Sequence, residues 1–114
     1  MRDYKVENFL EEEAISYEYR ESVLLVDVDR ERSLGTQARW GVRVTEDVVE
    51  DYAKAMAPQE GVDPWRRARI FPALVAYMGP KGYVIIGGLH REEAARMVAR
   101  PDFDMYVIIN TDKV

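Results

Sequence analysis

Hydrophobic and polar residues recur with different periods along the chain, and these periods predict its elements. Apolar residues at helical spacing within residues 1–14 predict a short amphipathic helix. Residues 15–20 alternate between apolar and polar, which is the pattern of a half-buried strand. A turn at Glu21–Ser22 would lead into residues 23–28, where the run is apolar on both faces. We therefore predict that residues 23–28 form an interior strand of a sheet.

The middle of the chain is more polar and contains one clear helix. Residues 29–43 are rich in arginine and contain two glycines, so we predict a loop there. Thr45 is a suitable N-cap, and the helix that follows carries an apolar stripe of Val48, Val49, Tyr52 and Met56. Residues 58–69 form a second connection, in which Asp63–Pro64 would begin a short helix.

The last third has the most regular pattern. Strands are predicted at residues 71–78 and 83–86, joined by a turn that contains two glycines and a proline. A helix follows from about His90 to Arg100, and residues 105–109 form a final strand. The order of these segments predicts an α+β fold, in which a small mixed β-sheet is flanked by two or three helices.

Length and composition set the scale of this fold. The chain has 114 residues, of which 47% are hydrophobic, and this amount suits one domain with its own core. We assign residues 23–114 to that domain and residues 1–22 to an N-terminal extension made of a short helix and a strand.

Charge and cysteine content restrict the classes of function. The chain has 16 lysine and arginine residues and 21 aspartate and glutamate residues, which gives a net charge of −5. This negative charge makes broad, nonspecific DNA binding a weak expectation. The sequence contains no cysteine, so it has no disulfide, thiolate metal site or thiol nucleophile, and it suits the reducing cytoplasm. Its apolar runs are too short to span a bilayer, and we expect no membrane partner.

One basic segment, Trp65–Arg69, stands out against the acidic background. It is either a nucleic-acid contact with Trp65 as a stacking platform, or a short helix whose Trp65 packs inward while its arginines pair with nearby acids. The net charge favours the second interpretation.

The candidate chemistry lies where the strand at 83–86 runs into Gly87–Gly88 and then into a helix. Glycines let backbone amides face outward, and a helix N-terminus attracts anions. His90 and Arg91 in the first turn could grip an anionic group, and Glu92 is a candidate acid or base. The plainer interpretation is that a tight strand–helix turn needs glycine for its geometry alone.

A longer stretch of sequence resembles a known family. Residues 71–75 and 83–95, including the run Gly87-Gly88-Leu89-His90-Arg91, resemble the ParB/sulfiredoxin-like superfamily, and residues 23–53 resemble the first half of its ParB-like nuclease domain. The similarity extends over roughly residues 23–110. Sulfiredoxin has a cysteine where this chain has Leu89, so sulfinic acid reduction is excluded.

The resemblance implies a nucleotide-binding domain that uses ATP or CTP, assisted by Mg²⁺, and in which hydrolysis or phosphoryl transfer would follow. Such a domain without an appended DNA-binding region resembles accessory proteins of phages and mobile elements. His90 and Glu92 are the catalytic candidates. The phosphate ligands implied by the resemblance are Gly87, Gly88, His90, Arg91 and Arg39.

Two other functions stay open at this point. The same fold could act as a metal-dependent DNA nuclease, whose activity would depend on His90 and Arg91. It could instead be a non-catalytic interaction module, in which the N-terminal apolar surface binds another protein or a second copy to form a homodimer.

Overall fold

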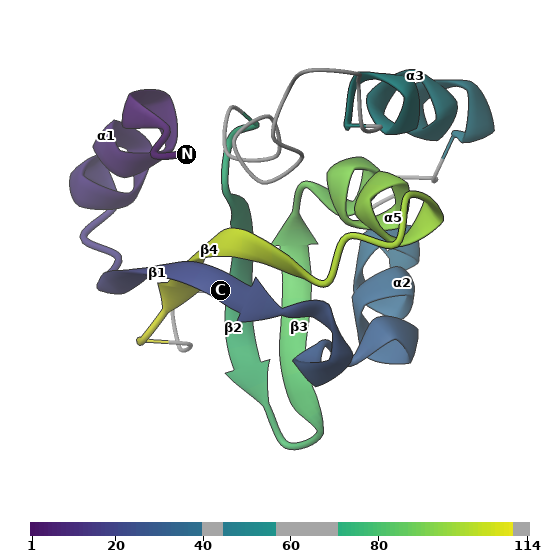
Figure 1. Ribbon diagram of the computed structural model, residues 1–114. Helices are drawn as coiled ribbons and strands as arrows, with labels where there is room; N and C mark the ends of the chain where they lie inside the picture. The colour runs from purple at the N-terminus through teal and green to yellow at the C-terminus, as the bar shows by residue number, and fades with distance from the viewer. Residues whose placement is uncertain (40–44, 57–70, 111–114) are drawn as a thin grey trace.

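The computed structural model describes residues 1–39, 45–56 and 71–110, and in this part of the chain a four-stranded mixed sheet holds the fold together (Figure 1). The strand order is β1-β4-β2-β3. β4 pairs antiparallel with β1 and parallel with β2, and β2 pairs antiparallel with β3. The strands are β1 (Tyr17–Leu24), β2 (Leu74–Gly79), β3 (Gly82–Gly87) and β4 (Asp102–Ile108). The prediction of an α+β fold with a mixed sheet is confirmed.

Helices cover the two faces of the sheet unequally. They are α1 (Tyr4–Glu12), α2 (Arg30–Arg39), α3 (Glu46–Met56) and α5 (Leu89–Met97). Figure 1 shows α2, α3 and α5 together on one side and α1 apart from them. The main core joins α3 and α5 to the sheet, through residues such as Val49, Ala94, Ile85 and Met105. α1 lies against the opposite face, where Val75, Ile86 and Ile108 project.

Several elements confirm the predictions from the sequence. The N-terminal helix, the strand that contains Tyr17 and Tyr19, and the C-terminal strand all form. The helix after Thr45 forms as well, and the amide of Val49 donates to the carbonyl of Thr45 at 3.0 Å. The hairpin of β2 and β3 turns between Gly79 and Gly82, as the pattern indicates.

The predicted interior strand at residues 23–28 is wrong. Val23 and Leu24 end β1, which is an edge strand, and Leu25–Asp27 form a single 3₁₀ turn, η1. Glu21–Ser22 is no turn, because the chain passes through it as a bulge within β1 while its register against β4 shifts. The apolar run is not buried on both faces, since Leu24 is 49% and Val26 83% exposed.

The predicted loop at residues 29–43 is also wrong, because residues 30–39 form α2. Asp29 begins this helix by accepting the amide of Arg32 at 3.1 Å through its carboxylate. Its carbonyl accepts the amide of Ser33 at 3.0 Å. This capping arrangement outweighs the low helix propensity of glycine at Gly35.

Some predictions fall outside the described residues, and the structure leaves them open. They are the short helix at Asp63–Pro64 and the basic segment Trp65–Arg69. The assigned boundary between residues 22 and 23 lies within β1, so the extension and the domain share one strand. No helix within residues 1–39, 45–56 and 71–110 has both the length and the apolar character to cross a membrane.

Candidate functional site

The site predicted from the sequence is the turn from β3 into α5, residues Gly87–Arg91, which we call the α5 turn. Gly88 precedes the helix with φ +92° and ψ 25°, a left-handed conformation. A Cβ at Gly88 would lie 2.6 Å from the Arg91 guanidinium and 2.7 Å from the Leu74 side chain. Only glycine satisfies both the backbone and the packing here, so its presence has a structural cause whether or not a ligand binds.

His90 connects the starts of two helices. Its Nε2 accepts a hydrogen bond from the amide of Thr45, the residue before α3, at 3.1 Å. The N-termini of α3 and α5 therefore lie next to each other. Because both helix dipoles place partial positive charge at these ends, the α5 turn is a favourable position for an anion.

Arg91 is half-buried beside Gly88 and forms no ion pair with any residue that the structure describes. Its Nη2 donates to the carbonyl of Ala73 at 3.5 Å, and no carboxylate in the described part of the chain lies within ion-pair distance. Desolvation lowers the pKa of Arg91, although Tyr52 and Asp3 partly offset this effect. An arginine nevertheless stays charged, so the α5 turn holds a positive charge that is partly removed from water.

Glu92 does not face the α5 turn. It is fully buried and pairs with Arg96, one turn further along α5, while Arg96 also donates to the carbonyl of Leu25 at 2.9 Å. Burial raises the pKa of Glu92, and the contact with Arg96 lowers it in part. These contacts give Glu92 a structural role, because they tie α5 to η1.

The remaining candidates are distributed around this site. Arg39 is the last residue of α2, and its side chain lies outside the described residues. Glu93 pairs with Arg30 of α2, whose Nε and Nη2 donate to the carboxylate oxygens of Glu93 at 3.0 and 2.6 Å. His90 bonds to the residue before α3, whereas Glu92 bonds to Arg96 on its own helix. The two side chains are therefore close in sequence but do not share a site. Within the described ranges, no group of three or more acidic or histidine side chains could hold a metal ion.

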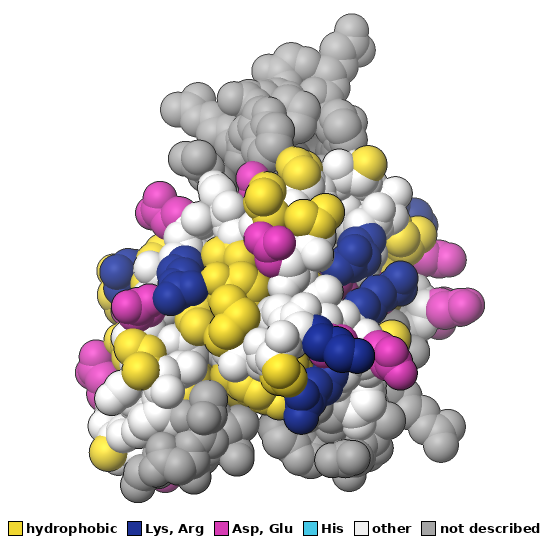
Figure 2. Space-filling view, turned by 90° about the horizontal axis from the view of Figure 1, so that it is seen from below, with side chains coloured by type: hydrophobic (Ala, Val, Ile, Leu, Met, Phe, Trp, Pro, Cys, Tyr) yellow, Lys and Arg dark blue, Asp and Glu magenta, His cyan; other side chains and the backbone are white. Residues whose placement is uncertain are grey.

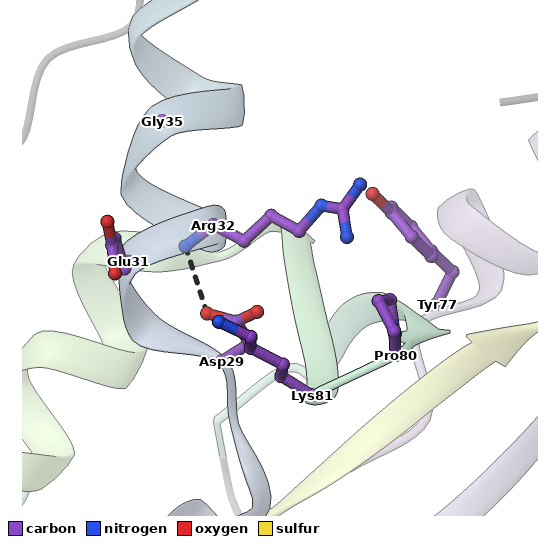
Figure 3. A pocket seen from close by; sticks show the side chains of 7 residues that line it. All are labelled: Asp29, Glu31, Arg32, Gly35, Tyr77, Pro80 and Lys81. Carbon is purple, nitrogen blue, oxygen red and sulfur yellow. Dashed lines mark hydrogen bonds between the residues drawn. The ribbon is translucent and has the colours of Figure 1, made fainter.

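A polar hollow at the opposite end of β3 was missed by the sequence analysis. It has a volume of about 400 Å³ and lies between the start of α2 and the β2–β3 hairpin. In Figure 3, Arg32 extends from α2 toward Tyr77, and Lys81 extends from the hairpin toward Asp29. The space-filling view from this end shows lysine and arginine side chains gathered beside an apolar surface (Figure 2). The sequence signal for the α2 side of this hollow was Asp29, because a favourable N-cap residue at that position would have predicted the helix.

Comparison of the chain with family models, with curated proteins and with solved structures found no match. The resemblance of residues 23–110 to the ParB/sulfiredoxin-like superfamily therefore stays a prediction from the sequence.

Proposed function

We propose that this protein is a binding domain for a phosphate-bearing ligand of the nucleotide class, and that the α5 turn is its binding site. The observation that carries the proposal is the half-buried Arg91 without a carboxylate partner among the described residues. A guanidinium in this position gains from an anion, and its planar donors match the oxygens of a phosphate.

The backbone of the α5 turn supports the same ligand class. The first amides of a helix have no partner within the helix, and in α5 these belong to Leu89, His90 and Arg91. Gly88 has no side chain, and the Arg91 guanidinium packs against it at the start of the helix. Together with the neighbouring end of α3, these groups would surround a phosphate with hydrogen-bond donors.

The contacts of the candidate catalytic side chains support ligand binding but assign no catalytic role to any of them. Glu92 is engaged with Arg96, Glu93 with Arg30, and His90 Nε2 with the amide of Thr45. Mg²⁺ would arrive with a nucleotide, since this ion is commonly held by substrate phosphates and few protein ligands. Nucleotide hydrolysis and DNA cleavage are then activities to assay once binding is established.

The experiment is a thermal unfolding series with ATP, CTP, GTP, inorganic phosphate and a nucleoside without phosphate, each with and without Mg²⁺. A ligand at ten times its Kd stabilises the folded state by about 1.4 kcal/mol, which raises Tm by about 5 °C. We expect such a rise for a phosphate-bearing ligand and none for the nucleoside.

Two arginine variants make the series specific to the α5 turn. Arg91→Gln should abolish the rise in Tm, because it removes the positive charge that would bind the phosphate. Arg20→Gln is the matched control, since Arg20 lies on β1 and pairs with Glu18 at 2.7 Å. An equal rise in Arg91→Gln and wild type would contradict the proposal, as would no rise with any phosphate compound.

Incubation of plasmid DNA with wild type and Mg²⁺ or Mn²⁺ tests the nuclease alternative on the same protein.

A further inference from the structure

A second surface lies on the face of the sheet opposite to α3 and α5. An open groove of about 620 Å³ runs between α1 and the strands β2 and β3, and we call it the α1 groove. Its lining is mainly apolar, and Gly87 contributes no side chain to it. The apolar residues that line it are Val6, Phe9, Leu10, Ile15, Val75, Ile86 and Ile108.

α1 is held firmly enough to make this groove a fixed feature. At its start, the amide of Asp3 donates to the Tyr106 hydroxyl at 2.7 Å, and the amide of Ala73 donates to the carbonyl of Met1 at 2.9 Å. At its end, the amide of Ser16 donates to Asn110 Oδ1 at 2.8 Å, and Asn110 Nδ2 donates to the carbonyl of Ala14 at 3.3 Å. The helix is thus fixed on both sides of the groove that it forms.

The part of this sheet face beside α1 is incompletely covered. On the far side of the face, Tyr77 of β2 lines the hollow at the start of α2, and Val84 of β3 is fully buried. The α1 groove is the open part of the face, where Val75 and Ile86 are half-buried.

The side of α1 that lines the groove carries opposite charges at its two ends. Lys5, Phe9 and Glu13 follow one another at intervals of four residues, so they form one stripe, and all three line the groove. Phe9 at the centre is 57% exposed although it lies beside other apolar side chains. The stripe has a positive end, an apolar centre and a negative end.

We propose that a second copy of this chain fills the α1 groove, with its α1 antiparallel to the first. A two-fold axis near Phe9 would place the two phenyl rings together and set Lys5 of each copy opposite Glu13 of the other. Each copy would then cover the open strands of the other with its own α1, so the contact is reciprocal. The parallel arrangement would set like charges side by side, which disfavours it.

The apolar and the charged residues of this contact have different roles. Burial of Phe9 and of the apolar floor at Val75 and Ile86 supplies most of the affinity. The Lys5–Glu13 pairs are near the surface and supply mainly the orientation. The inference does not depend on a ligand at the α5 turn.

Sedimentation equilibrium of the full chain, over protein concentrations from about 1 µM to about 1 mM, tests the inference. We expect wild type to pass from monomer to dimer across this range and Phe9→Glu to stay monomeric. Val26→Glu is the matched control, because Val26 is an exposed apolar residue on η1 outside the groove, and it should dimerise as wild type does.

Charge exchange tests the antiparallel arrangement itself. Lys5→Glu and Glu13→Lys should each weaken dimerisation about tenfold, because each creates two repulsive pairs per dimer. The double variant Lys5→Glu/Glu13→Lys should restore the wild-type affinity. Both positions are exposed, so folding should be unaffected in all three variants. A wild type that is monomeric at every concentration overturns the inference, and so does a Phe9→Glu protein that dimerises normally. A double variant that is weaker than both single variants overturns the antiparallel pairing.

Discussion

Gly88 combines a positive φ of 92° with close contacts to Arg91 and Leu74, so it should tolerate no other residue. In Gly88→Ala the new Cβ strains the backbone and displaces the guanidinium. We expect a loss of about 1–3 kcal/mol in the free energy of unfolding, measured by urea denaturation.

The control for this variant is Gly35→Ala in α2, where the added Cβ meets no described atom within 4 Å apart from the adjacent backbone of its own helix. Alanine has the higher helix propensity, so this change should stabilise the protein by about 0.5–1 kcal/mol. Equal effects of the two substitutions would show that Gly88 is not constrained as described.

Asp104 gives the protein a defined response to acid. Burial raises the pKa of this carboxyl, but the hydrogen bonds from the Met1 amine, the Ser22 amide and the Tyr19 hydroxyl together lower it. Because the pKa is lower in the folded state, the carboxylate stabilises the fold above about pH 4 and loses this contribution as the pH falls further. Asp104→Asn should therefore be less stable than wild type at neutral pH, and the difference should shrink at about pH 3. A difference that is constant with pH in urea denaturation would argue against this role.

Among the elements, α2 has a role that its sequence conceals. Ser33 is fully buried, and its hydroxyl donates to the carbonyl of Asp29 at 2.7 Å and accepts the amide of Ile85 at 2.9 Å. The amide of Asp29 donates to the carbonyl of Tyr83 at 2.8 Å. These bonds cover the outer edge of β3, which would otherwise present unpaired backbone groups.

Ser33→Ala should cost about 1–3 kcal/mol, because it leaves the buried amide of Ile85 without an acceptor. Ser16→Ala serves as the control, since the Ser16 side chain is exposed, and it should change stability by less than about 0.5 kcal/mol. If urea denaturation gave the same midpoint for both variants, the seal between α2 and β3 would contribute little.

The sequence predicted those elements whose pattern is local. The period of two in Tyr17 and Tyr19, the cap at Thr45 and the glycines of the β2–β3 hairpin each determine structure through neighbouring residues. The cap at Asp29 was a local signal for α2, but the burial of Ser33 against Ile85, which is 52 residues away, could not be predicted from neighbouring residues. The predicted site shows the same limit, since the partners of His90 and Arg96 outside α5 are set by how this helix packs on α3 and η1.

For the molecule as a whole, the α5 turn and the α1 groove are neighbouring surfaces with separate chemistry. Phe9 and Arg91 share no contact, so each surface should work without the other. We expect the Phe9→Glu protein to keep its ligand-dependent rise in Tm, and the Arg91→Gln protein to keep its dimerisation. Loss of both properties in either variant would show that the two surfaces are one site.

The measurement that tests the central claim most directly is a two-dimensional amide NMR titration with the nucleotide that gives the largest rise in Tm. If a phosphate binds at the α5 turn, the amides of Leu89, His90 and Arg91 should show the largest shift changes, because they are the donors that face it. The same titration of Arg91→Gln should leave these amides unmoved. Largest changes in α1 or in the hollow between Asp29 and Lys81, with none at residues 89–91, would contradict the account.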